Sequence, residues 1–145
     1  MSTQIPQGFE PLENPGAFLE LVGPLHVRHD GVLGVRAHAR HLNRAGTVMG
    51  GFLATFVDAA FGQAIRQDAA EEATVATVSL TTDFLRPGPA GAWLEAHTEV
   101  EHLGGRLAFA DCSVRADGEE LVRARAVFAV RSEAEPLHAH PEDPG

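Results

Sequence analysis

The sequence predicts an α+β domain in which an antiparallel sheet packs against one long central helix. The first observation is a glycine-bearing loop that opens into a helix, over residues 42–67, with apolar side chains on almost every face. The second is a run of four strand-like segments joined by turns, at 73–85, 92–103, 106–116 and 120–131. Because a helix that is apolar all round is buried in a core, we expect the sheet to cover this one.

The composition is that of a single globular domain. The 145 residues are 44% hydrophobic, which suits one core and is too high a content for disorder. We assign residues 17–131 to this domain and residues 1–16 to an N-terminal arm, with Phe9 or Leu12 packed on the domain. Residues 132–145 are expected to form an acidic, disordered tail.

Several classes of protein are disfavoured by the same sequence. No apolar run reaches the length of a membrane span, and the N-terminus lacks the basic and apolar regions of a signal peptide. A net charge of −9 argues against a broad nucleic-acid surface. The single cysteine, Cys112, rules out an internal disulfide and suits a small core residue. We therefore expect a cytoplasmic protein that binds neither membranes nor nucleic acid.

The segments before the helix predict a helical turn and two strands. Residues 17–29 begin as a helical turn and end as a strand, because Gly23-Pro24 interrupts them. Asp30-Gly31 is a hairpin signal. Residues 31–41 then alternate, which predicts a half-buried strand whose inward face consists of Leu33, Val35, Ala37 and Ala39.

The four later segments also alternate, as expected of strands that are buried on one face. In residues 73–85 one side carries Ala76, Val78, Leu80 and Phe84, and the other carries Thr77, Ser79, Thr81 and Asp83. The inward residues of the other three are mostly Ala and Val, which let a helix approach closely: Leu94, Ala96, Thr98, Val100, Ala108, Ala110, Cys112, Val114, Val122, Ala124, Ala126, Phe128 and Val130. Gly104-Gly105 and Asp117-Gly118 predict hairpins between them.

The opposite face of these strands carries apolar side chains among charges. These side chains are Trp93, Leu107, Phe109 and Leu121. We expect a partner chain to bury this face in part.

Two separated motifs resemble those of the hotdog-fold acyl-CoA thioesterases of the phenylacetate-pathway type. The loop before the helix and the helix itself carry the first motif, formed by Asn43, Gly46, Gly50, Gly51 and Asp58 in the family's spacing. The second motif ends a strand with Asp-Phe-Leu-Arg-Pro-Gly-Pro-Ala-Gly at residues 83–91, and Gly104-Gly105-Arg106 is similar to the family's later hairpin. The resemblance covers residues 21–130. It departs from the family at Met49, where the family has His.

The resemblance implies the hotdog fold, with a curled antiparallel sheet around the long helix. It also implies a homodimer with active sites at the subunit interface, or a homotetramer, and hydrolysis of an acyl-CoA to a free acid and CoA without a cofactor. Asp58 would activate the water as general base, or attack as a nucleophile. The backbone N–H of Gly50 would polarise the thioester carbonyl. Asn43 would place the carbonyl or the water, and Thr77 would hold the water beside Asp58.

The substrate itself is expected to contact a second set of residues. Met49 and Gly51 flank the proposed carbonyl donor, and Phe61 is one of three helix phenylalanines that leave aromatic or medium-chain acyl groups open. Arg86 and Arg106 are our choices for the phosphates of CoA.

Each of these residues also has a purely structural interpretation. Asp58 suits a carboxylate bonded to a neighbouring strand, and Asn43 suits a turn residue that holds its own backbone. Thr77 suits the polar face of a strand, Gly50 and Gly51 suit a tight turn with close packing, and the two arginines suit a solvated surface.

The spacing of Gly50 and Asp58 constrains the proposed mechanism. They are eight residues apart on one helix, and therefore about 12 Å apart along its axis at 1.5 Å per residue. One thioester carbonyl cannot reach both. Either only one of them acts, or each active site takes Gly50 from one subunit and Asp58 from the other.

Two other functions remain open from the sequence. The loss of His at Met49 favours a non-catalytic acyl-CoA binding or regulatory module. A hotdog hydratase or dehydratase needs a His beside an acid, and no histidine is suitably placed. The eight histidines show no metal spacing, and His38 and His41 are expected to diverge, so we expect no metal site.

Overall fold

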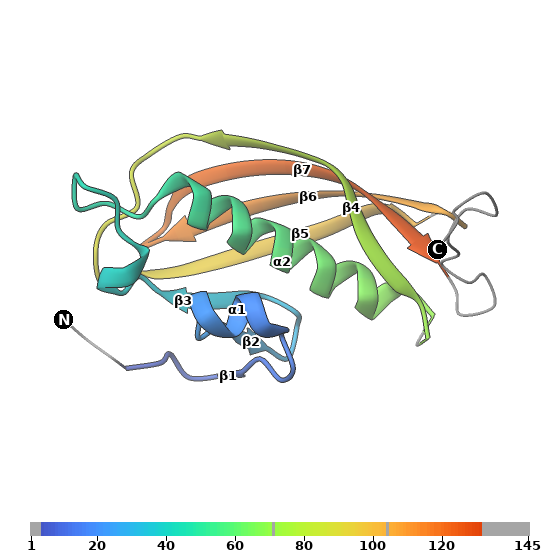
Figure 1. The fold of residues 1–145 in the computed structure, drawn as a ribbon, viewed down its shortest axis with the longest axis horizontal. Helices are drawn as coiled ribbons and strands as arrows, with labels where there is room; N and C mark the ends of the chain where they lie inside the picture. Colours follow the sequence, from blue (N-terminus) through green and yellow to red (C-terminus); the bar gives the residue numbers. More distant parts are fainter. Residues whose placement is uncertain (1–3, 71, 104, 132–145) are drawn as a thin grey trace, which may run out of the picture.

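The computed structural model describes residues 4–70, 72–103 and 105–131. These residues form one seven-stranded antiparallel sheet, with the long helix α2 (Gly50–Asp68) along one of its faces (Figure 1). The sheet order is β1-β2-β3-β5-β6-β7-β4, so β1 and β4 form its two edges. The other elements are β1 (Phe9–Pro11), α1 (Ala17–Val22), β2 (His26–Arg28), β3 (Leu33–Arg36), the 3₁₀ helix η1 (Ala39–His41), β4 (Thr74–Phe84), β5 (Trp93–Leu103), β6 (Leu107–Ala116) and β7 (Glu119–Arg131). The predicted α+β class is confirmed.

Most of the core lies between α2 and the neighbouring strands β5, β6 and β7. Their predicted inward residues are buried or half-buried, and the alanines among them leave room for the helix. The predicted hairpin at Asp117-Gly118 is present, with φ of 50° and 80° at its two residues. Positive φ at both positions matches the right-handed twist of the strands that the turn connects. The hairpin expected at Gly104-Gly105 lies partly outside the described residues.

Helix α2 buries only one of its sides. The side that faces the sheet consists of Phe52, Leu53, Phe56, Val57, Ala60, Phe61, Gly62 and Ile65. On the other side Thr55 and Asp58 are half-buried, and Gly51 is exposed. The expectation that α2 is buried all round is wrong for a single chain, because one sheet covers one side of a helix. The carboxylate of Asp58 therefore lies on the side that the chain leaves uncovered.

A β-bulge in β4 changes which side chains face the helix. The pairing of β4 with β7 shifts between Thr77 and Ser79, so Val78 is an extra residue in β4. A single extra residue moves every side chain on one side of it to the opposite face. The alternation predicted for residues 73–85 is therefore right for Leu80 and wrong for Thr77, whose hydroxyl faces α2 and contacts Asp58.

The chain leaves the sheet sooner than the pattern of residues 31–41 predicts. Strand β3 ends at Arg36, and η1 follows. The backbone N–H of His38 donates to the ring Nδ1 of His41 at 3.0 Å, a local bond that turns the chain. Ala39 is consequently exposed rather than inward.

The N-terminal arm covers Trp93 within the same chain. Strand β1 pairs with β2, and the ring of Phe9 meets Trp93 edge-on with centroids 5.1 Å apart. A Cβ at Gly34 would lie 2.2 Å from Trp93, so this close packing requires glycine. Leu121 is buried within the chain as well, so it needs no partner chain to cover it, whereas Leu107 and Phe109 stay exposed on the outer face.

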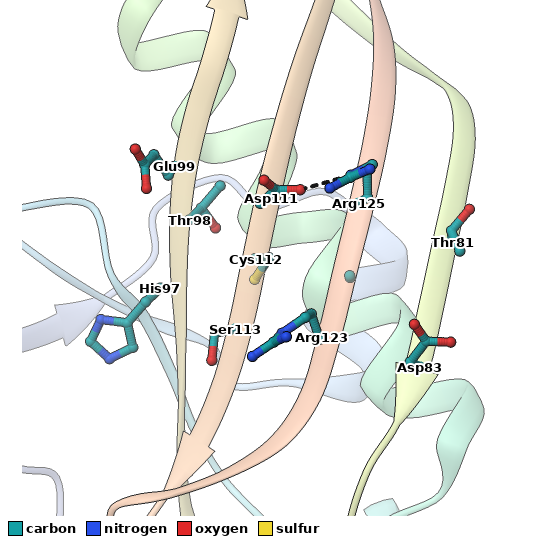
Figure 2. Close-up of a pocket in the computed structure, with 11 residues that line it drawn as sticks. Thr81, Asp83, His97, Thr98, Glu99, Asp111, Cys112, Ser113, Arg123 and Arg125 are labelled. Atoms are coloured by element: carbon teal, nitrogen blue, oxygen red, sulfur yellow. Dashed lines mark hydrogen bonds and ion pairs between the residues drawn. The ribbon is translucent and has the colours of Figure 1, made fainter.

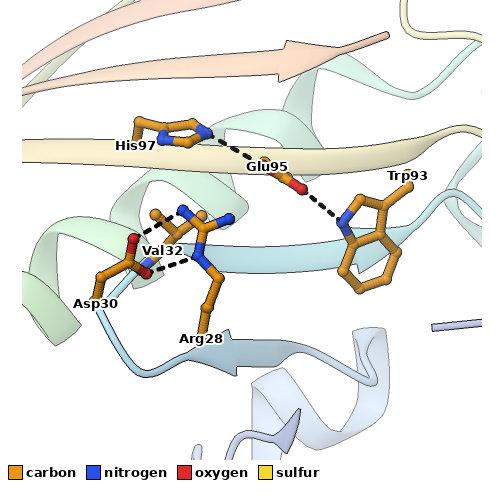
Figure 3. A network of polar contacts seen from close by, with 6 residues as sticks. All are labelled: Arg28, Asp30, Val32, Trp93, Glu95 and His97. Carbon is orange, nitrogen blue, oxygen red and sulfur yellow. Dashed lines mark hydrogen bonds and ion pairs between the residues drawn. The ribbon is translucent and has the colours of Figure 1, made fainter. Parts of the chain in front are cut away.

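Polar contacts lie around Trp93 and in the neighbouring turn after β2 (Figure 3). The indole N–H of Trp93 donates to Glu95 at 3.1 Å, and the other carboxylate oxygen of Glu95 lies 3.2 Å from the ring of His97. Arg28 donates twice to Asp30, and this bond is the main reason that the pKa of Asp30 lies well below its usual range. The first set of contacts lies within β5, and the second holds the turn that follows β2. Within the described ranges, no helix has the length and apolar content needed to cross a bilayer.

Candidate active site

The loop before α2 is held by the side chain of Asn43. Its Oδ1 accepts the backbone N–H groups of Ala45, at 2.9 Å, and Thr47, at 3.2 Å. Its Nδ2 donates to the hydroxyl of Thr47 at 3.0 Å. These bonds correspond to the turn interpretation of Asn43, because both ends of its amide are used within the loop.

The N-terminus of α2 presents unused backbone donors. The N–H of Met49 donates to the carbonyl of His41 at 2.8 Å, and the first intrahelical bond runs from Leu53 N–H to Met49 O at 3.0 Å. Gly50, Gly51 and Phe52 therefore have no intrahelical acceptor for their N–H groups. The side chain of Met49 is 55% exposed at this end. These N–H donors and the helix dipole together stabilise a negative charge that develops at the N-terminus of α2.

Packing within one chain does not explain the two glycines. A Cβ at Gly50 would make an ordinary contact with Phe84 at 3.6 Å, and one at Gly51 would meet nothing within 4 Å. Neither residue has a positive φ. Gly lowers helix stability by up to about 1 kcal/mol relative to Ala. A close approach of the substrate or of a second subunit to the backbone would account better for Gly50 and Gly51.

A hollow of about 290 Å³ opens at this end of α2. It is lined by Val48, Gly50, Leu53, Phe84, Leu85, Arg86, Pro87 and Gly88, so both sequence motifs meet in it. Arg86 donates to the carbonyl of Glu120 at 2.8 Å and lies 3.6 Å from the carboxylate of Glu119. Arg106, the other expected phosphate ligand, is exposed and does not line this hollow.

Asp58 lies in a second hollow, of about 370 Å³. The hydroxyl of Thr77 donates to its Oδ1 at 2.6 Å. The hollow is lined by Phe18, Leu19, Ala54, Thr55, Asp58, Ala59 and Leu80, which come from α1, α2 and β4. The sequence placed Thr77 near Asp58 only through the resemblance, and the bulge at Val78 is what turns the hydroxyl toward it.

No residue lines both hollows. Gly50 in the first hollow and Asp58 in the second are eight residues apart on α2, which corresponds to about 12 Å along the helix. A donor at Gly50 and a base at Asp58 therefore cannot act on one carbonyl within one chain. Phe61, which we expected at the substrate, is fully buried with its ring centroid 6.1 Å from that of Phe128, and lines neither hollow.

His41 is a structural residue near the site that the sequence did not reveal. Its ring is stacked on Phe52 with centroids 4.1 Å apart, and only 3% of the residue is exposed. Because Nδ1 accepts the N–H of His38, the proton is on Nε2, which donates to the carbonyl of Val22. His38 and His41 are thus adjacent, contrary to the expected divergence. Burial lowers the pKa of His41, so the ring is neutral near pH 7.

A larger hollow, of about 870 Å³, lies on the opposite face of the sheet (Figure 2). Several of its polar side chains are paired: Arg125 with Asp111 at 3.0 Å, and Ser113 and Arg123 with Glu120. Cys112 lines it but is 3% exposed, and burial raises the pKa of its thiol to about 11, which makes it a poor nucleophile. Among the residues that the structure describes, no three histidines, cysteines or acids form a group that could hold a metal ion.

Comparisons with known proteins agree with the motifs in this region. Residues 45–123 match the family model described as the thioesterase superfamily, and this span contains α2 and β4. The chain is 38% identical over 122 residues to "Putative esterase PA0474" of Pseudomonas aeruginosa, covering 81% of this chain and 90% of that protein.

Solved structures are similar to this one in fold. A mutant of the phenylacetic acid degradation protein PaaI from Thermus thermophilus has a TM-score of 0.67 and 28% identity, over 77% of this chain and 96% of that chain. The BH2602 protein from Bacillus halodurans, solved with CoA, has a TM-score of 0.73 over 80% of this chain and 77% of that chain. At 23% identity, the second likeness shows the fold alone.

Proposed function

This chain belongs to the thioesterase superfamily, and on that premise we propose that it hydrolyses an acyl-CoA thioester to a free acid and CoA. The observation that carries the proposal is the carboxylate of Asp58, which accepts a hydrogen bond from the Thr77 hydroxyl and lines a mostly apolar hollow. A carboxylate placed in this way can activate water beside an apolar acyl group. The fold neighbour from Bacillus halodurans was solved with CoA, the thiol product of this reaction.

The chemistry follows from two positions on the exposed side of α2: its N-terminus at Gly50 and Asp58 in its middle. Thr77 fixes one oxygen of Asp58, and the other oxygen takes a proton from water as that water adds to the thioester carbon. The backbone N–H of Gly50 donates to the oxyanion that forms. The C–S bond then breaks, and the CoA thiolate takes the proton held by Asp58. A direct attack by Asp58 through an anhydride remains the alternative route.

Two subunits would supply one active site in this mechanism. The separation of the two hollows supports this, and so does β4, which forms a sheet edge with Val78 60% exposed. An unprotected edge strand can pair with the same strand of a second copy. A homodimer of this kind would bring the Gly50 end of one α2 toward Asp58 of the other. The exposed Leu107 and Phe109 on the outer face would suit a further doubling to a tetramer.

One observation favours a second function. Met49 stands where the related thioesterases have a histidine, which favours an acyl-CoA binding module without turnover. A hydratase is less well supported, because His41, whose backbone carbonyl accepts the N–H of Met49 at this end of α2, is buried with both ring nitrogens bonded.

Thiol release from a panel of acyl-CoAs separates these functions. Turnover of at least one acyl-CoA supports the proposed hydrolysis. Tight binding of every thioester without thiol release would support the binding module instead. Hydration of an enoyl-CoA without thiol release would support a hydratase.

A further inference from the structure

Helix α1 forms one wall of the hollow that contains Asp58. Phe18 and Leu19 line the hollow from α1, opposite Ala54 and Ala59 of α2 and Leu80 of β4. Figure 1 shows α1 alongside α2. Resting on the proposed function, we propose that this hollow binds the acyl group of the substrate, and that Phe18 makes it selective for apolar acyl groups of medium-chain or aryl size.

The chemistry of the lining indicates which part of an acyl-CoA enters. Among the described residues that line it, Thr55 is the only polar one besides Asp58, and its hydroxyl already donates to the carbonyl of Gly51 at 3.0 Å. The pantetheine arm carries amides that would lack partners here, and an unpartnered buried amide costs free energy. The phosphates of CoA would be repelled by the carboxylate of Asp58. An apolar acyl group avoids both penalties and leaves its carbonyl beside that carboxylate.

The exposure of Phe18 also supports an apolar acyl group as the occupant of this hollow. Its side chain is 60% exposed although it borders an apolar hollow, whereas Leu19 and Val22 of the same helix pack against the core. Covering the ring with an acyl group would remove apolar surface from water. Small side chains at Ala54 and Ala59 leave the room that such a group needs.

The wall is anchored to the rest of the chain at one end. Arg40 donates to the carbonyl of Gly23 at 3.0 Å, and His41 donates to that of Val22. Because His41 also stacks on Phe52 of α2, the position of α1 relative to α2 is set by a buried contact. Phe18 is therefore part of a helix whose position is fixed, as selectivity between acyl groups requires.

The test is the affinity of S-ethyl-, S-hexyl- and S-phenethyl-CoA, thioether analogues that cannot be hydrolysed. In the full-length protein, we expect affinity to rise roughly fourfold per methylene that enters the hollow. Phe18→Ala should weaken the hexyl and phenethyl compounds roughly fivefold to tenfold, and change the ethyl compound less than twofold. Phe18→Leu should retain most of the affinity for the hexyl compound.

Leu21→Ala is the matched control, since Leu21 is 74% exposed on the same helix but does not line the hollow. It should leave all three affinities unchanged. The proposal is overturned if Phe18→Ala weakens the ethyl and hexyl compounds equally, weakens neither, or changes the oligomeric state, which would make Phe18 a subunit contact. Thiol release by the unmodified protein, measured separately, distinguishes failure of the hydrolysis from failure of this assignment.

Discussion

Asp58 and Thr77 form the contact on which the proposed chemistry depends. Thr77 occupies Oδ1 at 2.6 Å, and none of the described residues donates to Oδ2, which leaves that oxygen free to accept a proton. Asp58→Asn keeps the size of the side chain but removes this base. We expect kcat/KM for the best acyl-CoA to fall about 10²–10⁴-fold while the melting temperature changes little.

Asp68→Asn, at the other end of the same helix, provides the control and should leave hydrolysis unchanged. A rate for Asp58→Asn close to that of the unmodified protein would make Asp58 a structural residue.

Met49 stands at the N-cap of α2, the position at which the resemblance to the thioesterases implies a histidine. Its thioether cannot donate a hydrogen bond to the substrate, whereas an imidazole can. Since the backbone donor at Gly50 remains in either case, we expect Met49→His to raise kcat with little change in KM. Steady-state kinetics on the best acyl-CoA would measure both values. An unchanged or lower kcat in a folded variant would favour the acyl-CoA binding module.

At the scale of the element, a substitution in the first turn of α2 is expected to raise stability and to lower activity. Gly51 has open space around a Cβ and no positive φ, so Gly51→Ala should stabilise the helix by about 0.5–1 kcal/mol. If the substrate or a second subunit approaches the backbone closely, the same change should lower kcat/KM. Denaturant unfolding and hydrolysis rates of one variant test both. A variant that is more stable and equally active would show that nothing approaches Gly51.

Two buried histidines, His41 in η1 and His26 in β2, make stability depend on pH. Burial lowers the pKa of His41 and of His26. Both rings therefore stay neutral in the folded chain at a pH near 6.5, where they take up protons in the unfolded chain. Stability should therefore fall as the pH drops from about 6.5 toward 5.5, by roughly 1 kcal/mol for each fully shifted histidine. Thermal unfolding across this range measures the effect.

His41→Phe is the informative variant for this prediction. It retains a ring to stack on Phe52 but has no titrating nitrogen, so it should be less stable at pH 7.5 and less sensitive to acid. An equally steep loss of stability below pH 6.5 in His41→Phe would exclude His41 as its source.

At the scale of the whole molecule, the proposed active site requires two chains. We expect sedimentation at micromolar concentration to give at least twice the 15.4 kDa mass of one chain. Val78→Asp should weaken the dimer and hydrolysis together, because it would place like charges at a symmetric β4 edge. Leu107→Asp, on the outer face, should at most convert a tetramer to a dimer. A fully active monomer would exclude the shared site.

The order of the long elements α2 and β4 to β7, and the inward faces of β5, β6 and β7, follow from the sequence alone. Alternation over ten or more residues and the hairpin at Asp117-Gly118 are local patterns, and the predicted inward residues keep to one face although the pairing shifts near Glu101 in β5 and near Leu121 in β7. The two motifs likewise placed Gly50 and Asp58 on one helix, and simple helix geometry separated them.

Tertiary structure alone decided the features that depend on a single contact. One extra residue at Val78 reverses the faces of part of β4, and no periodicity reveals where such a bulge falls. The burial of Phe61 and the covering of Trp93 by Phe9 depend on which element packs against which. Side-chain periodicity reports which face of a segment is apolar, but only the packed chain determines what that face meets.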